Sequence, residues 1–177
     1  MANLKESDIM ERLSKVDELL KKFYLNQNIY DSLNILEDIL SNLDSSIMNF
    51  KKLHIVLEKI IEIFEKTDNR TRECILLLLK KYSHLFNNSI YDSISKSNDD
   101  NICFGMRNLI IKNLNNNNNH IFKRQCLNLL KILPFLIDGK IKDMILFFLN
   151  DKSLIEEEKK EIYSILNLKY VDYNLKI

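Results

Sequence analysis

Three stretches of the chain resemble copies of one helix: residues 30–36 (YDSLNIL), 72–78 (RECILLL) and 124–130 (RQCLNLL). Aligned without gaps, they place three small residues in register: Ser32, Cys74 and Cys126. The copies are 42 residues apart (32 to 74) and then 52 residues apart (74 to 126). A unit that recurs at such intervals usually buries its apolar face against the next copy, so the pattern predicts a stack of helical pairs.

The composition excludes most folds other than an all-helical one. Only two glycines and one proline occur in 177 residues, too few for the turns of a many-stranded sandwich or for phosphate-binding loops. With 46% hydrophobic residues, 29% charged residues and a net charge of +1, the chain is an ordinary globular sequence rather than a basic or acidic one. Its length predicts one domain.

Apolar residues recur at helical spacing in eight segments, and local signals mark where these segments begin and end. Residues 26–28, all polar, are expected to end the first helix. Asp68 is expected to cap a helix that begins at Arg70, and Pro134 to end a helix near Leu133. Ser153, with a glutamate three residues later, resembles a capping box for the last helix.

The segments pair in chain order. The predicted pairs are residues 4–24 with 29–43, 47–64 with 70–86, 102–114 with 120–137, and 140–150 with 153–168. A polar stretch at 87–101 is predicted to be a spacer between the second and third pairs. The asparagine run at 115–119 is predicted to be a lengthened turn within the third pair.

Polar residues at two of the turns match a pattern seen in helical repeat proteins. Asp68 stands one helical turn before Arg72, and Asn118 or Asn119 stands before Lys123 and Arg124. This arrangement resembles the turn-to-helix pattern of HEAT and armadillo-type repeats, in which such groups tie neighbouring repeats together. The resemblance implies that Arg72 and Arg124, with Ser32, Cys74 and Cys126, are structural repeat positions.

The predicted fold class is therefore all-α, an α-solenoid of about four HEAT-like helical pairs with eight or nine helices. It is expected to form one domain over residues 1–168, followed by a C-terminal tail at 169–177. Within this superfamily, the second and third pairs resemble the N-terminal solenoid of the Integrator complex subunit 7 family. The residues that carry this resemblance are Asn69, Arg72, Cys74, Ile75, Leu76, Phe104, Arg107, Ile111, residues 117–119, Arg124, Leu127, Leu130 and Leu133.

No residue set predicts catalysis, a cofactor or a metal. The three histidines, His54, His84 and His120, are far apart in sequence and form no metal-binding motif. Cys74 and His84 are separated by ten residues, about 15 Å along a helix, too far for a nucleophile and its base. The cysteines are therefore expected to fill small buried sites, and the chain is not expected to be an enzyme.

Composition also limits the choice of partner and compartment. Basic doublets recur, but acidic residues intervene throughout, which argues against nucleic-acid binding. The longest apolar runs, residues 75–79 and 144–149, are far shorter than the ~20 residues that span a bilayer, so no membrane insertion is expected. Three cysteines, an odd number, without an apolar leader at the start of the sequence predict an intracellular location, nuclear or cytoplasmic.

The resulting hypothesis is a non-catalytic scaffold or adaptor that binds protein partners in a multi-subunit assembly. The Integrator resemblance implies a nuclear RNA-processing assembly, and an adaptin-like trafficking subunit fits the same repeat spacing. A compact helical regulatory domain that binds a partner helix, and an enzyme or small-molecule binder with a deep pocket, are the alternatives. A solenoid keeps its first and last helices apart, whereas a compact domain packs them together.

Overall fold

The fold of the described part of the chain is entirely helical. The computed structural model describes residues 4–21, 26–43, 50–86, 101–114, 120–150 and 155–166. Every regular element within these ranges is an α-helix or a short 3₁₀ turn, which confirms the all-α prediction. Most of the predicted spacer, the asparagine turn at 115–119 and the tail at 169–177 lie outside the described residues.

Eight α-helices and two 3₁₀ turns make up this described part. The helices are α1 Glu6–Lys21, α2 Asn26–Ser41, α3 Phe50–Lys66, α4 Asn69–Lys81, α6 Asn101–Leu114, α7 His120–Ile132, α8 Gly139–Phe148 and α9 Glu156–Ile165. The 3₁₀ turns are η2 Ser83–Leu85, after α4, and η3 Pro134–Leu136, after α7.

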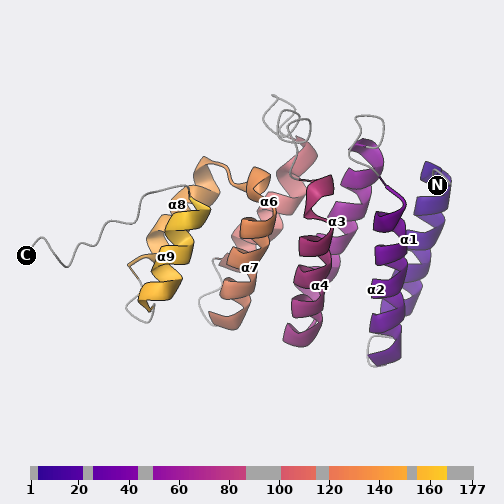
Figure 1. Cartoon of the computed structure of the whole chain (residues 1–177), viewed down its shortest axis with the longest axis horizontal. Coiled ribbons are helices and arrows are strands. Elements are labelled where there is room, and N and C mark those ends of the chain that lie inside the picture. The colour runs from indigo at the N-terminus through magenta and orange to yellow at the C-terminus, as the bar shows by residue number, and fades with distance from the viewer. Residues whose placement is uncertain are drawn as a thin grey trace, which may run out of the picture.

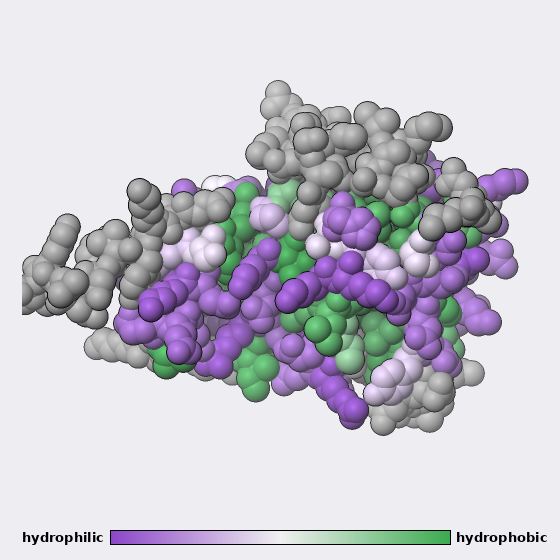
Figure 2. Space-filling view, in the orientation of Figure 1, coloured by the Kyte–Doolittle hydropathy of each residue, from purple (hydrophilic) through white to green (hydrophobic). Residues whose placement is uncertain are grey.

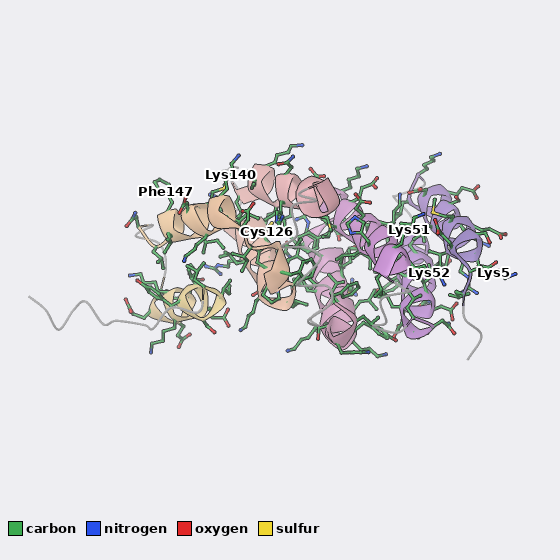
Figure 3. All side chains as sticks on the ribbon, turned by 90° about the horizontal axis from the view of Figure 1, so that it is seen from above. Lys5, Lys51, Lys52, Cys126, Lys140 and Phe147 are labelled. Atoms are coloured by element: carbon green, nitrogen blue, oxygen red, sulfur yellow. The ribbon has the colours of Figure 1, made fainter. Side chains whose placement is uncertain are left out.

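The helices follow one another along the longest axis of the molecule in the order of the sequence (Figure 1). Seen from above, they form two layers, one of α1, α3, α6 and α8 and the other of α2, α4, α7 and α9 (Figure 3). Contacts join the members of a pair, as in α1 with α2, and neighbours within a layer, as in α3 with α6 and α4 with α7. We call these the first-helix layer and the second-helix layer.

Aspartate caps fix the start of two helices. The side chain of Asp68 accepts a hydrogen bond from the backbone N–H of Thr71 at 2.8 Å, so α4 begins at Asn69, as the sequence predicts to within one residue. The Asp138 side chain accepts from the N–H of Ile141 at 2.8 Å and caps α8 in the same way. Each cap satisfies a backbone donor that has no partner inside the helix.

Pro134 ends α7 as predicted. The helix stops at Ile132, Leu133 has φ −120° and ψ 65°, and Pro134 opens η3. Proline lacks a backbone N–H and disfavours helical geometry in the residue before it, which accounts for the break. The hydrogen bond from the N–H of Leu133 to the carbonyl of Leu129, at 2.9 Å, is the last of the helical ladder.

Two predicted boundaries are wrong. Residues 26–28 do not interrupt the chain between helices but form the first turn of α2, where the Asn28 side chain donates to the carbonyl of Leu19 at 3.2 Å. The last helix begins at Glu156 rather than at Ser153, which lies outside the described residues. Glu158 accepts from the N–H of Ile155 at 3.4 Å, so the glutamate of the capping pattern lies two residues later than predicted.

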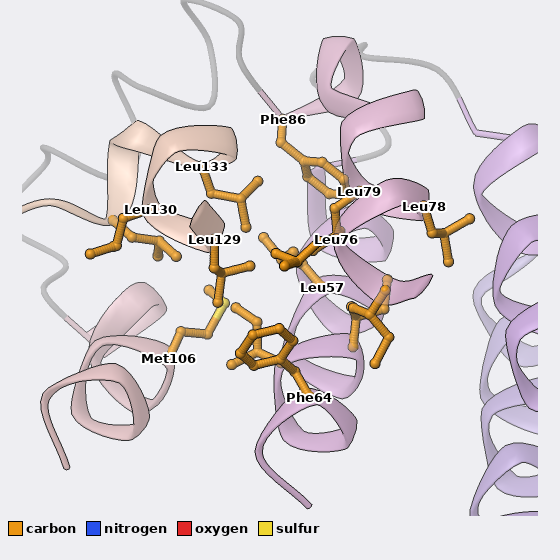
Figure 4. Close-up of a cluster of buried hydrophobic side chains, with 14 of the residues drawn as sticks. Leu57, Phe64, Leu76, Leu78, Leu79, Phe86, Met106, Leu129, Leu130 and Leu133 are labelled. Atoms are coloured by element: carbon orange, nitrogen blue, oxygen red, sulfur yellow. The ribbon is translucent and has the colours of Figure 1, made fainter. Parts of the chain in front are cut away.

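A single apolar core runs between the two layers. Its central part combines side chains of α3, α4, α6, α7 and the segments that follow α4 and α7, all at most 6% exposed (Figure 4). They include Leu57, Phe64, Leu76, Leu79, Phe86, Met106, Leu129, Leu130 and Leu133. Because each pair contributes side chains to the core it shares with its neighbour, the pairs cannot be separated without exposing apolar surface.

Candidate functional site

The predicted repeat position Arg72 lies at the centre of a buried polar network. Its guanidinium donates to the backbone carbonyl of Phe64 at 3.0 Å and to the side chain of Asn69 at 3.0 Å. It also lies 3.9 Å from the ring centroid of Phe122, on α7. Arg72 is only 9% exposed, and burial lowers the pKa of its guanidinium, which is still fully charged at neutral pH. Arg72 therefore ties the α3–α4 turn to the next helical pair.

Gln125 completes this network from α7, and sequence reasoning missed it. Its side-chain amide donates to the backbone carbonyl of Asn69 and to the carboxylate of Glu73, both at 3.1 Å. Its oxygen accepts from Arg72 at 3.5 Å. With 2% exposure, Gln125 is among the most buried polar side chains described. The only sequence signal for it is a polar residue on the apolar side of a helix.

Arg124, the second predicted arginine, has a different environment. Its guanidinium forms an ion pair with Glu158 of α9 at 2.6 Å, and the side chain is 61% exposed. Lys131 makes a similar exposed ion pair with Glu161 at 2.8 Å. These contacts also join neighbouring pairs. Although Glu158 is only 20% exposed, the other three side chains are about half exposed or more, and ion pairs open to solvent contribute about 0–1 kcal/mol.

The three small repeat residues are not equally buried. Ser32 is 2% exposed and donates to the carbonyl of Asn28 at 2.7 Å. Cys126 is 1% exposed, and burial raises the pKa of its thiol to about 12, against the opposing effect of Arg72. Cys74 is half-buried. A thiol with so high a pKa is not a nucleophile, so Cys126 acts as a packing residue.

The burial pattern of the second-helix layer relates different residues from those aligned by sequence. Buried positions, all at most 8% exposed, repeat at an offset of 39 residues from α2 to α4 and 51 residues from α4 to α7. The buried sets related in this way are Ser32, Thr71 and Phe122; Leu36, Ile75 and Cys126; Ile39, Leu78 and Leu129; and Leu40, Leu79 and Leu130. In this register the counterpart of Arg72 is Lys123, which is 8% exposed, rather than Arg124.

Several cavities among the described residues are open furrows between neighbouring helices. One furrow in the second-helix layer, which we call the α4–α7 groove, has a volume of about 380 Å³. Its lining includes Glu73, Leu76, Leu77 and Lys80 of α4, and Asn128, Lys131 and Ile132 of α7. Figure 2 shows this face, on which green apolar patches interrupt a mostly purple polar surface.

Leu77 is the main apolar feature of the α4–α7 groove. Its side chain is 68% exposed in the middle of α4, although its neighbours Leu76 and Leu78 are at most 8% exposed. A sequence signal exists for this residue: it stands in a run of five apolar residues, 75–79, and a helix with one buried side cannot cover all of them. The exposed residue therefore faces solvent by geometry, not by local disorder.

A second furrow follows α1 and α3 in the first-helix layer, and we call it the α1–α3 furrow. It holds two cavities of about 560 and 440 Å³. Its charges pair with one another: the ammonium of Lys59 lies 2.8 Å from the carboxylate of Asp17 and 3.4 Å from that of Glu62. The pKa of Lys59 is raised, because these carboxylates outweigh its partial burial.

The described ranges contain neither a candidate metal site nor a helix that could span a membrane. Within them, no group of three or more histidine, cysteine or acidic residues could hold a metal ion. His54 is half-buried on α3, with its pKa lowered by burial, whereas His84 is exposed on η2 and the side chain of His120 is outside the described set. None of the helices described is both long and apolar enough to cross a bilayer.

Comparison with known proteins identifies no relative of the chain. No protein-family model, curated protein or solved structure matches the chain.

Proposed function

We propose that the chain is a non-catalytic scaffold or adaptor, built as an α-solenoid of four helical pairs of the HEAT or armadillo type, that binds protein partners. The observation that carries this proposal is the agreement between chain order and spatial order. Each pair contacts the pairs before and after it in sequence, and α1 and α9 lie at opposite ends of the longest axis (Figure 1). Stacks of this kind create long surfaces that suit extended or helical partners.

The separation of α1 from α9 also distinguishes this proposal from its main alternative. A compact regulatory domain would pack its first helix against its last. Here the two helices are separated by the α3/α4 and α6/α7 pairs (Figure 3). This arrangement favours a scaffold over a compact domain with one central groove.

The shape and lining of the furrows support a macromolecular partner. The α4–α7 groove and the α1–α3 furrow lie open between helices, and their walls include exposed side chains such as Leu77 and Met10, which are 68% and 49% exposed. Small-molecule sites usually enclose most of their ligand. Open furrows with apolar residues at the surface fit a polypeptide better than a small substrate.

The assembly itself is proposed from the sequence resemblance. The Integrator-like residues fall in the two central pairs, where Arg72 is the main polar link. Membership of a nuclear RNA-processing assembly is the more specific form of the proposal, and an adaptin-like trafficking assembly is its competitor.

Isolation of the chain from its native cells tests the scaffold proposal. The chain would carry an affinity tag, be expressed at its natural level and be purified after mild cross-linking. We expect a stoichiometric protein partner and a complex larger than the monomer, and the identity of that partner separates the nuclear from the trafficking assembly. A matched variant, Leu129→Ala, opens a cavity in the core between pairs and so destabilises the fold. The amount of partner that it recovers should fall in proportion to the fraction of the variant that is unfolded.

Recovery of the monomer alone would contradict the scaffold proposal. Small-angle X-ray scattering of the purified chain tests the architecture independently. An elongated particle is expected for a stack in which α1 and α9 lie at opposite ends, and a spherical particle would contradict it.

A further inference from the structure

Several surface features compete as a site for the partner. Among the large apolar side chains that the structure describes, Phe147 is the most exposed, at 75%, and lies on α8 at the C-terminal end of the stack (Figure 3). Nothing in the described residues indicates what covers it. Tyr30 is 47% exposed but accepts a hydrogen bond from Arg70 at 3.4 Å. Met10 borders the α1–α3 furrow, whose central charges already pair with one another.

The α4–α7 groove differs because apolar and charged groups are segregated along it. Glu73 lies toward the start of α4, Leu76 and Leu77 in the middle, and Lys80 in the last turn. Lys131 lies in the last turn of α7 and lines the same end of the groove as Lys80. Both helices run in the same direction (Figure 1). The lining residues therefore give the groove an acidic end, an apolar centre and a basic end.

The charges at the two ends are not equivalent. The Glu73 carboxylate accepts a hydrogen bond from Gln125 at 3.1 Å and is engaged within the protein. The Lys80 side chain is exposed, and its ammonium has no ion pair or hydrogen bond with any of the described residues. Lys131 forms an ion pair with Glu161, but both side chains are about half exposed, at 49% and 54%. Such an exposed ion pair can be replaced by another at little cost in free energy.

Lysines in a last helical turn also suit the helix dipole, which explains their position but not the exposure of Leu77. Leu77, 68% exposed, and the unpaired ammonium of Lys80 line the same groove. An exposed apolar side chain next to such a cation can recognise a ligand with complementary groups. The complement is an apolar side chain followed by carboxylates.

We propose that the α4–α7 groove binds an acidic amphipathic segment of a partner protein. An apolar side chain of the segment packs on Leu77, and its acidic residues lie at the Lys80 and Lys131 end. This inference rests on the proposed scaffold function and specifies the chemistry of the partner. The polarity of the groove also fixes the direction in which the segment lies along α4.

A selection from a displayed library of random 16-residue peptides, with the full chain as bait, tests this proposal. Enriched peptides are expected to combine spaced apolar residues with glutamate or aspartate near one end. Binding of a synthetic enriched peptide, followed by fluorescence anisotropy, should weaken about tenfold in Leu77→Ser and severalfold in Lys80→Glu. Replacing the acidic residues of the peptide by lysine should also abolish most of its binding, and added salt should weaken what remains.

Matched control variants lie in the first-helix layer. Phe147→Ser removes another exposed apolar side chain and Lys142→Glu reverses another exposed lysine, both on α8. Both should leave peptide affinity unchanged within about twofold, the scale of ordinary surface substitutions. Circular dichroism of each variant checks that the helices remain intact.

Three results would overturn the proposal. One is enrichment of basic or purely apolar peptides, or no enrichment at all. Another is equal binding of acidic peptides to the wild-type chain and to Leu77→Ser. The third is a concentration-dependent dimer that Leu77→Ser dissolves, since the groove would then be occupied by a second copy of the chain.

The partner isolated from native cells separates failure of this inference from failure of the scaffold proposal. If that partner is recovered equally by the wild-type chain and by the double variant Leu77→Ser with Lys80→Glu, the chain is a scaffold but binds elsewhere. If no partner is recovered while acidic peptides still bind the groove, the groove inference stands and the scaffold proposal fails.

Discussion

The two junctions on either side of the α6/α7 pair are built in different ways. The central junction, between α3/α4 and α6/α7, combines the buried network of Arg72 and Gln125 with an apolar cluster (Figure 4). The terminal junction, between α6/α7 and α8/α9, has buried isoleucines such as Ile162 but joins α7 to α9 through exposed ion pairs. The Arg72 and Gln125 contacts of the central junction are therefore shielded from water, whereas the cations of the α7–α9 ion pairs are 61% and 49% exposed. The terminal junction also has a half-buried polar link, since Arg107 of α6, with a side chain 13% exposed, donates to the carbonyls of Phe135 and Leu136 and lies 4.0 Å from Asp138, the cap of α8.

This difference implies unequal stability along the stack. Buried hydrogen bonds to a charged group contribute more than exposed ion pairs, and their loss leaves unsatisfied groups in the core. In a stack whose pairs contact only their neighbours, an end pair has one junction and a central pair has two. We therefore expect α8/α9 to open before the centre of the molecule does.

The largest expected effect comes from cavities placed at the two junctions. Leu129 and Ile162 are both 1% exposed, so truncation of either to alanine removes similar buried surface. Leu129→Ala should lower the free energy of unfolding of the whole chain by about 2–5 kcal/mol. Ile162→Ala should instead loosen α8/α9 alone. Chemical denaturation followed by circular dichroism measures both variants.

The form of the unfolding curve decides this comparison. A single shifted transition is expected for Leu129→Ala, and an additional early transition for Ile162→Ala. Equal single transitions for the two variants would show that the junctions unfold as one unit, and the contrast between them would fail.

The arginines test the polar part of the comparison. Lysine at position 72 would keep the charge but not the fork that reaches Phe64, Asn69 and Gln125 at once. Arg72→Lys should therefore cost about 1–3 kcal/mol of unfolding free energy. Arg124→Lys, which leaves one exposed charge in reach of Glu158, should cost less than about 0.5 kcal/mol.

Thermal denaturation of these two single variants provides the measurement, with each as the control for the other. Equal losses of stability would mean that the two arginines contribute equally to the free energy of unfolding. A larger loss for Arg124→Lys would reverse the proposed order of the junctions.

The arginines also show how far the sequence predicts this molecule. Helical periodicity, few glycines and the repeated motif were enough to predict an all-helical chain and the order of its helices. The aspartate cap at Asp68 and the break at Pro134 were predictable because each acts through its immediate neighbours. Such local signals need no knowledge of the fold.

The register between pairs was not predictable in the same way. Consecutive helical residues point about 100° apart, so a shift of one residue exchanges a buried position for an exposed one. Motif similarity aligns Arg72 with Arg124, whereas burial relates Arg72 to Lys123 and leaves Arg124 at the surface. Only the packing of α4 against α7 distinguishes these alternatives, and it depends on residues that are distant in sequence.

Thiol labelling measures the opening of each junction directly. Cys126 has a pKa of about 12 in the folded chain, so at pH 8 it reacts with iodoacetamide only when the central junction opens. Cys74→Ser and Cys103→Ser remove the other thiols. A second variant carries these two substitutions together with Cys126→Ala and Ile162→Cys, so that its single thiol, at residue 162, reports on the opening of the terminal junction. We expect labelling at residue 162 to be at least about tenfold faster, equivalent to ~1.4 kcal/mol.

Leu130→Cys is the matched truncation control, because it places the same new thiol at a fully buried site of the central junction. It should be labelled more slowly than Ile162→Cys if the junctions differ intrinsically. Equal rates at residues 130 and 162 would mean that the truncation itself causes the fast labelling.

The raised pKa of Cys126 also makes stability depend on pH. The folded thiol retains a proton that an unfolded thiol releases near pH 9, so the contribution of Cys126 to the free energy of unfolding is complete below that pH and declines as pH rises toward 12.

The smallest expected effect is the response of the two junctions to salt. Raising ionic strength from 0.1 to 1 M shortens the screening length from about 10 to 3 Å, which weakens exposed ion pairs far more than buried hydrogen bonds. Hydrogen exchange of α9 should therefore accelerate in high salt by less than about fivefold, since exposed pairs contribute at most ~1 kcal/mol, while exchange of α4 stays constant. Glu158→Gln removes the partner of Arg124 and should abolish part of the response. If α9 exchanges equally in low and high salt, its attachment depends on Ile162 and its apolar neighbours alone, and the contrast between the junctions is one of apolar packing rather than of charge.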